Sequence, residues 1–227
     1  MLSSVDGRID GAALRGVIDG KEYETTGTTL GGDAWICGRT TMQQHFAEKE
    51  PFIPSSDRLA GPQPVHVARL AGSYAISVDT LGRLRWKGGD LAGDHLICVV
   101  SERAPGEYLA MLREKGISYI VAGTGAVDLV RAVDLLGEHF GIRILLLEGG
   151  GQINGAFLDA GLVDELSLLI GPGVDGRSGV PAVFEGMKTA KTSAVALRLK
   201  SMEQRPGGTV WLRYEVVQPP SRNQPET

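Results

Sequence analysis

The chain has 227 residues, which is enough for one domain with a single large core. Its formal net charge of −4 and the lack of any block of lysines and arginines argue against nucleic acid as a partner. No apolar run reaches the ~18 residues of a membrane span, and residues 1–10 lack the basic start and apolar centre of a signal peptide. We therefore expect a cytoplasmic protein with no membrane contact.

The pattern of apolar residues predicts strands that alternate with helices. In chain order we expect a strand over 33–38, a helix over 39–50, a surface connection over 51–64 and a half-buried strand over 73–79. Three strand-helix units follow, with strands over 95–101, 117–123 and 142–150 and helices over 105–116, 128–141 and 153–161. The last elements are an apolar run over 164–172, a hairpin over 193–217 around a Gly-Gly turn, and a polar tail over 218–227 that we expect to be disordered.

This order is typical of the α/β class, with a largely parallel central sheet, helices on both faces and a C-terminal antiparallel hairpin. We expect one domain over 1–217. Cys37 and Cys98 each lie in an apolar run and are expected to be buried, unpaired side chains. The four histidines show no metal-binding spacing, so we predict no metal, and we expect His45 on the surface.

The segment "LLLEGGGQINGAFLDAGLVDEL", residues 145–166, runs from an apolar strand through three glycines into a helix. Backbone N–H groups at a helix start suit a phosphate. The alternative is that the glycines only allow tight packing of the helix on the strand. A Rossmann domain is disfavoured, because that fold has its glycine turn in the first strand-helix unit and an acidic residue about 20 residues later.

Two further strand ends carry anion-binding side chains. "WICGRTTM" provides Arg39, Thr40 and Thr41, and "VVSERAP" provides Ser101 and Arg103. A threonine at this place can also be a plain helix cap, and the arginines can be solvated surface. The carboxyl ends of parallel strands share one edge of the sheet. The glycine turn and these two strand ends would therefore line one crevice. Several anion sites on one edge suit a dinucleotide with a pyrophosphate and a 2′-phosphate.

The segments "SSVDGRI", "DAWICGRTTM", "SVDTLGRL", "VVSERA" and "LLLEGGGQINGAFLDAGLVDEL" occur in this order over nearly the whole chain. Together they resemble the pyrimidine reductase domain of riboflavin biosynthesis, which shares the dihydrofolate reductase fold. The resemblance implies NADPH as the hydride donor and a homodimer through the terminal hairpin, whose alternating apolar residues include Val210, Leu212 and Tyr214.

Carried over residue by residue, the resemblance assigns two groups of site residues. Asp6 and Glu148 would face the nicotinamide and the substrate, and either could supply a proton if burial raised its pKa. The cofactor contacts would be Gly149, Gly150, Gly151, Gln152 and Ile153 at the pyrophosphate and nicotinamide, Gly38, Arg39, Thr40 and Thr41 at other phosphate contacts, and Ser101 and Arg103 near the 2′-phosphate.

The substrate side departs from the family pattern. The usual Ser-Gly-x-Ser-x-Trp stretch and the Asp-Asp-Pro motif are replaced by "DGAALRGVIDGKEYETTG" and "QQHFAEKEPF". The zinc motifs of the deaminase that is often fused to this domain are also absent. Three readings stay open: a reductase of the ribosylaminopyrimidinone phosphate, a reductase of another pyrimidine, pteridine or imine-like compound, and a nucleotide-binding protein without catalysis.

Overall fold

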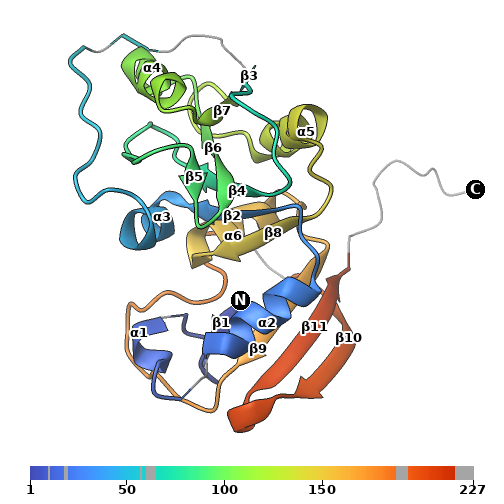
Figure 1. The fold of residues 1–227 in the computed structure, drawn as a ribbon. Helices are drawn as coiled ribbons and strands as arrows, with labels where there is room; N and C mark the ends of the chain where they lie inside the picture. The colour runs from blue at the N-terminus through green and yellow to red at the C-terminus, as the bar shows by residue number, and fades with distance from the viewer. Residues whose placement is uncertain (10, 18–19, 57, 60–64, 188–193, 218–227) are drawn as a thin grey trace, which may run out of the picture. The chain divides into compact units, whose positions relative to one another are not determined.

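The computed structural model describes residues 1–9, 11–17, 20–56, 58–59, 65–187 and 194–217. Contacts divide the chain into two compact units: Thr26–Asn154, called the central unit, and Met1–Thr25 with Gly155–Thr227, called the terminal unit. Each unit contains its own sheet (Figure 1). The expected single domain over 1–217 stays a prediction, and the expected disordered tail over 218–227 lies outside the described residues.

The central unit has a seven-stranded sheet of order β3-β7-β6-β4-β2-β8, with β5 beside β6. The five strands β7, β6, β4, β2 and β8 form four parallel pairings, while β3 and β5 are antiparallel to their neighbours. The largely parallel sheet predicted from the alternating pattern is confirmed. The strands are β2 (Ala34–Gly38), β3 (Val65–His66), β4 (Tyr74–Val78), β5 (Asp90–Leu91), β6 (Asp94–Val100), β7 (Ser118–Val121) and β8 (Leu145–Gly149).

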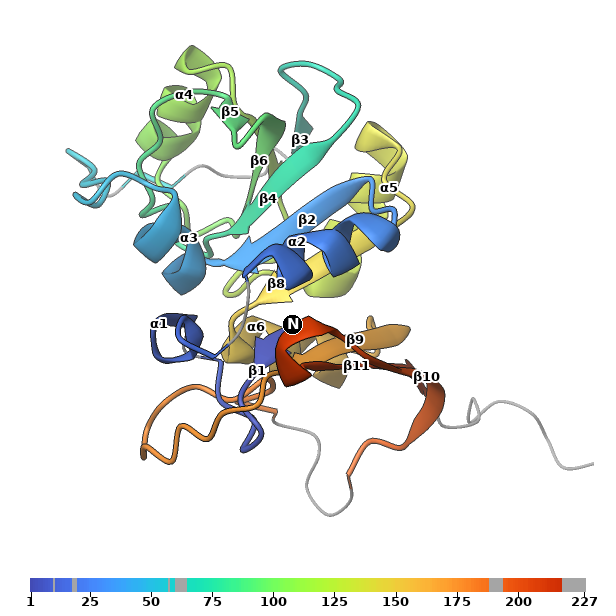
Figure 2. The same ribbon diagram turned by 60° about the horizontal axis from the view of Figure 1, so that its bottom comes forward.

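Helices cover both faces of this sheet, because alternate residues of each strand point to opposite sides. The helices are α3 (Arg39–His45), α4 (Gly106–Glu114) and α5 (Leu129–Phe140). On one face Cys37 and Cys98 join a core that contains Met42 of α3 and Leu112 of α4. On the other face the Tyr74 ring meets Phe140 of α5, with 5.5 Å between ring centroids. Figure 2 shows α3 and α4 on one side of the strands and α5 on the other.

Both cysteines are buried free thiols, as predicted. Ser77 of β4 pairs with Cys37 on one side and with Cys98 on the other. The two cysteines are therefore two strand spacings apart, about 10 Å, which is too far for a disulfide.

Two predictions about individual elements are wrong. The strand around Ile76 is fully buried instead of half-buried, because β4 lies between β2 and β6 and under helices on both faces. The helix expected over 39–50 ends at His45, since the backbone of Phe46 leaves the helical region and its ring packs on Trp35. His45 itself is exposed, as expected.

The terminal unit has a four-stranded sheet of order β1-β9-β11-β10. The predicted terminal hairpin is confirmed, with a turn of 3-10 helix over Pro206–Gly208. The strands are β1 (Leu2–Ser3), β9 (Glu165–Ile170), β10 (Leu197–Gln204) and β11 (Val210–Val216). Three more helices occur: α1 (Gly11–Leu14), and α2 (Gly20–Thr29) and α6 (Gly151–Asp159), which both run from one unit into the other. Helix α2 was not predicted, because its glycines and threonines are poor helix formers.

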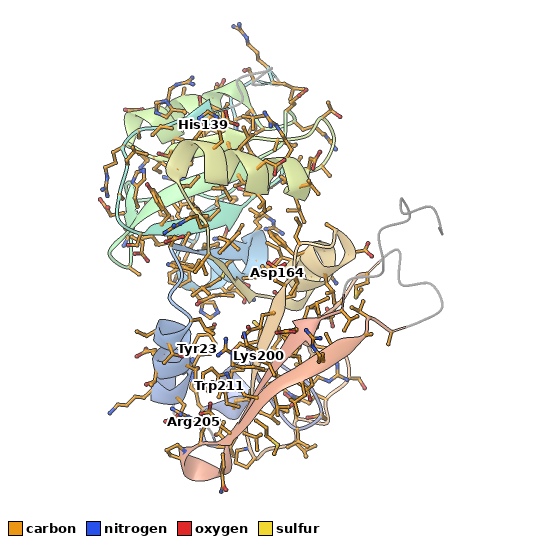
Figure 3. The ribbon with its side chains drawn as sticks, turned by 90° about the vertical axis from the view of Figure 1, so that its right-hand side faces the viewer. Tyr23, His139, Asp164, Lys200, Arg205 and Trp211 are labelled. Atoms are coloured by element: carbon orange, nitrogen blue, oxygen red, sulfur yellow. The ribbon has the colours of Figure 1, made fainter. Side chains whose placement is uncertain are left out.

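The two faces of the terminal sheet differ in character. On one face Trp211 is buried, Arg205 and Arg213 lie over its ring at 5.7 Å, and Arg205 pairs with Glu22 of α2 (Figure 3). On the opposite face Leu199 and Met202 are 55% and 68% exposed. They pair in register with Tyr214 and Leu212 of β11, so apolar side chains continue across the hairpin.

Within the described residues, no helix has the length and apolar character needed to cross a bilayer. The same residues contain no group of three or more His, Cys, Asp or Glu side chains arranged to hold a metal ion.

Candidate functional site

The predicted nucleotide-binding segments of the central unit end at the same edge of its sheet. β8 lies beside β2, β2 beside β4, and β4 beside β6, all in parallel, so the turns after Gly149, Gly38 and Val100 share that edge. The structure therefore brings together the three segments that the sequence placed on one crevice.

The glycine turn is joined directly to the turn that follows β2. The backbone N–H of Gly150 donates to Oγ1 of Thr41 over 3.1 Å, and the N–H of Asn154 donates to the carbonyl of Gly150. The Gly149–Gly150 peptide bond is cis. Helix α6 begins at Gly151, two residues earlier than the sequence predicted. Thr41 is thus an anchor for the glycine turn, and the reading of it as a helix cap is wrong because Gly38 is the cap residue of α3.

The glycines of this segment are needed for different reasons. Gly149 has φ +102°, a backbone conformation that L side chains rarely adopt. A Cβ on Gly155 would lie 1.9 Å from the carbonyl oxygen of Glu185, so Gly155 is required by packing. A Cβ on Gly150 would meet only Oγ1 of Thr41, at an ordinary contact distance of 3.5 Å. Neither packing nor φ explains Gly150, which favours the approach of a ligand to its backbone.

Glu148 occupies a β-bulge. Ile36 pairs with Leu147 and the next residue, Cys37, pairs with Gly149, so Glu148 is the extra residue in β8. A bulge turns the side chain of its extra residue away from the regular alternation and is common beside active sites. Burial raises the pKa of the Cys37 thiol to about 12, and the nearby charge of Glu148 adds to this rise. The Glu148 carboxylate therefore lies near Cys37, at the end of β2.

The residues of the segment after β2 differ in how far they are buried. Arg39 and Thr40 are exposed, Thr41 is half-buried, and the side chain of Ile153 covers Gly38, where an added Cβ would lie 3.4 Å from it. A Cβ at this distance makes an ordinary contact, so packing alone does not require glycine at position 38. Of the remaining predicted residues, Gly151 is buried and Gln152 is exposed.

Ser101 and Arg103 have different surroundings. Ser101 is fully buried, its hydroxyl donates to the carbonyl of Thr80 over 2.8 Å, and it accepts from the N–H of Arg103 over 3.2 Å. Arg103 is exposed. Because the Ser101 hydroxyl already donates its proton to Thr80, it has no proton left for a phosphate oxygen, and the expected phosphate contact of this segment stays a prediction for Arg103.

Asp79 also lies at this edge, and the sequence analysis did not predict a role for it. It follows β4, between the ends of β2 and β6, and is fully buried. Its Oδ2 accepts from the N–H groups of Arg83 and Leu84 over 2.5 and 2.7 Å. The available signal was an aspartate at a strand end, three residues before Gly82, which is typical of a side-chain-capped turn.

In the terminal unit, Asp6 holds a loop. Its carboxylate accepts from the Ser4 hydroxyl over 2.6 Å and from the N–H groups of Asp175 and Gly176 over 3.0 and 2.9 Å. The Ser4 bond and these two backbone bonds lower the pKa of Asp6 well below its usual range. The condition for proton donation by Asp6, a pKa raised by burial, is therefore not met.

The residues of the central edge fit a phosphate-bearing nucleotide. Arg39 and Arg103 are exposed cations whose guanidinium groups form no hydrogen bond or ion pair with any other described residue. Gly150 leaves open the space that a side chain would fill. Cationic side chains and a glycine-lined helix start are the donor set that phosphates prefer.

Comparison with known proteins gives one family match and several relatives. The family model described as "RibD C-terminal domain" matches residues 1–211. A 2,5-diamino-6-ribosylamino-4(3H)-pyrimidinone 5′-phosphate reductase of Aquifex aeolicus is 37% identical over 123 residues, 53% of this chain and 54% of the relative. The reductase of that name in Methanothermobacter thermautotrophicus is 38% identical over 102 residues, 44% and 46% of the two chains. The aligned region thus spans about half the length of these curated relatives.

Solved structures show the same fold at low identity. A pyrimidine reductase-like protein of Corynebacterium diphtheriae superposes with a TM-score of 0.69 at 19% identity, covering 96% of this chain and 90% of the other. A riboflavin biosynthesis reductase of Saccharomyces cerevisiae gives 0.61 at 18% identity, covering 95% and 87%. The α/β fold expected from the resemblance is confirmed.

Gly150→Ala tests the reading of the glycine turn. We expect the Kd for NADPH to rise by about tenfold or more, because the new methyl group blocks the approach of a phosphate to the backbone. The melting temperature should change by less than about 3 °C, since the protein itself leaves room for a Cβ. Titration calorimetry and thermal unfolding of one preparation measure both quantities.

Gly155→Ala is the matched control, because the clash with Glu185 should lower the melting temperature first. If Gly150→Ala lowers the melting temperature as much as Gly155→Ala does and leaves the NADPH affinity unchanged, the glycine turn serves packing and not ligand binding.

Proposed function

Since the chain belongs to the RibD C-terminal domain family, the pyrimidine reductases of riboflavin biosynthesis, we propose that it transfers a hydride from NADPH to a ribosylaminopyrimidinone phosphate. The observation that carries the proposal is the glutamate and glycine turn at the end of β8. There a bulged Glu148 lies two residues before Gly150, whose φ and packing do not require glycine and whose N–H is bonded to Thr41.

In this proposal, N–H groups and arginines bind the phosphates of the cofactor, and a carboxylate binds the substrate. Backbone N–H groups at the start of α6 would hold the pyrophosphate of a bound NADPH, and the guanidinium groups of Arg39 and Arg103 would hold its phosphates, with Arg103 near the 2′-phosphate. NADPH, when bound, supplies the hydride. Glu148 binds the pyrimidine and provides the proton that reduction of a C=N bond requires. Asp6, which stays ionised, accepts hydrogen bonds and holds the loop around Asp175.

Two alternatives remain, and one experiment separates them. The missing substrate-side motifs are compatible with another small pyrimidine, pteridine or imine-like substrate, or with a nucleotide-binding protein that has lost catalysis. NADPH oxidation, followed by absorbance with a panel of these compounds, should be fastest with the ribosylaminopyrimidinone phosphate. Oxidation with another compound alone favours the second reductase, and binding of NADPH without oxidation favours the non-catalytic protein.

The proposal predicts that NADPH binds more tightly than NADH. One charge-assisted bond to phosphate contributes about 1.5 to 3 kcal/mol, which is about ten- to a hundredfold in affinity. The double change Arg39→Ala and Arg103→Ala should remove the difference, whereas Arg131→Ala, on the exposed surface of α5, should keep it. Equal affinities of the unchanged protein for both nucleotides, measured by titration, would sink the prediction.

Glu148→Gln separates binding from chemistry. We expect NADPH affinity within about twofold of the original and a kcat lowered at least about tenfold, as when an interaction made in the transition state is removed. Glu138→Gln, an exposed position of α5, is the control and should leave kcat unchanged. An unchanged kcat in Glu148→Gln would exclude this carboxylate as the proton source.

We also propose a homodimer through the apolar face of the terminal sheet. The support is the continuous apolar surface of Leu197, Leu199 and Met202 with Leu212 and Tyr214, because exposed apolar faces of this kind usually mark interfaces. The double change Leu199→Asp and Met202→Asp should convert the dimer to a monomer, as measured by light scattering at micromolar concentration. Leu70→Asp, an equally exposed leucine of the central unit, should leave the mass unchanged, and a monomeric original protein would contradict the proposal.

A further inference from the structure

The turn after β4 is built around Asp79. One carboxylate oxygen, Oδ2, accepts from the N–H groups of Arg83 and Leu84, and the carbonyl of Asp79 accepts from the N–H of Gly82. The N–H of Asp79 donates to the carbonyl of Val99 in β6. This single residue therefore closes the turn over 80–84 and fixes it to the neighbouring strand.

The next residue, Thr80, connects this turn to the segment after β6. The carbonyl of Thr80 accepts from both the N–H and the hydroxyl of Ser101, over 3.1 and 2.8 Å. The hydroxyl of Ser101 in turn accepts from the N–H of Arg103. A chain made of the Asp79–Thr80 peptide bond and the hydrogen bonds of Ser101 thus runs from the fully buried Asp79 to the backbone N–H of the exposed Arg103.

The charge of Asp79 is not what the turn requires. Burial raises the pKa of this carboxyl, against the opposing effects of the Leu84 and Arg83 N–H groups and of the Arg39 and Arg83 charges. Its second oxygen, Oδ1, is buried and has no hydrogen-bond partner among the described residues. A buried negative charge beside Arg39 also opposes the binding of an anion there.

We infer that Asp79 is a positioning residue of the nucleotide-binding edge, which acts through Thr80 and Ser101 to orient Arg103 toward the 2′-phosphate. The inference rests on the proposed function, because it assumes that Arg103 meets this phosphate. It assigns Ser101 to the same hydrogen-bonded chain and not to the ligand. What Asp79 contributes is an acceptor oxygen at the Oδ2 position.

Three variants test the inference, each titrated with NADP⁺ and with NAD⁺. Asp79→Asn keeps an acceptor oxygen for the two N–H groups and removes the charge, so NADP⁺ should bind as in the original protein or up to about fivefold more tightly. Asp79→Ala removes the acceptor, and Ser101→Ala breaks the chain one step later. Both should raise the Kd for NADP⁺ about tenfold, the usual effect of one lost charge-assisted bond, and the Kd for NAD⁺ by less than about threefold.

Ser118→Ala is the matched control for a loss of stability. Ser118 is also fully buried, and its hydroxyl accepts from the N–H of Ala68 and bonds His95, but it lies at the start of β7, away from the carboxyl ends of the strands. It should lower the melting temperature about as much as Ser101→Ala while the ratio of the two Kd values stays unchanged. If Asp79→Ala does not fold, Ser101→Ala decides.

Three outcomes overturn the inference. If the original protein prefers NADP⁺ and Ser101→Ala leaves the ratio of the Kd for NAD⁺ to the Kd for NADP⁺ unchanged, the inference alone is overturned. The same holds if Asp79→Asn loses as much affinity for NADP⁺ as Asp79→Ala does. A ratio near one in the original protein overturns the proposed cofactor preference and the inference with it.

Discussion

The hydrogen bond from the Gly150 N–H to Thr41 Oγ1 is the contact on which the candidate site depends. It joins two turns that are 109 residues apart in the chain and that follow neighbouring parallel strands. The bond uses the N–H group of the residue directly before the first residue of α6. Thr41 therefore acts on the shape of the glycine turn, and Arg39, two residues earlier, is held beside that turn on the same short helix.

Much of the fold was predictable because the central strands are apolar and the helices between them begin and end with clear signals. Helix α5 is the clearest case, with Asp128 capping its start and Gly141 in the left-handed conformation at its end. The errors occur where the sequence has no such signal. The residues of α2 are polar and include two glycines, and the burial of β4 depends on its neighbours in the sheet and not on its own alternation.

The site was predictable in its location but not in its details. Sequence placed Arg39, Arg103 and the glycine turn at strand ends, and parallel pairing then requires one edge. It could not show that Glu148 is the extra residue of a bulge, because a bulge is a property of two paired strands. It also could not show that the Ser101 hydroxyl is already bonded to Thr80, since a buried serine and a ligand-binding serine look alike in a sequence.

The three carboxylates of interest differ in what surrounds them, and this determines what each can do. Asp6 accepts three hydrogen bonds, which stabilise its charged form and make it an acceptor near neutral pH. Burial raises the pKa of Asp79, and the two N–H donors on one of its oxygens oppose that rise and suit the residue to hold a turn. Glu148 lies half-buried in a bulge where regular strand geometry is interrupted, beside a thiol whose pKa it helps to raise. Of the three, only Glu148 combines partial exposure with a position beside the glycine turn, and the proposed proton transfer to a substrate relies on both.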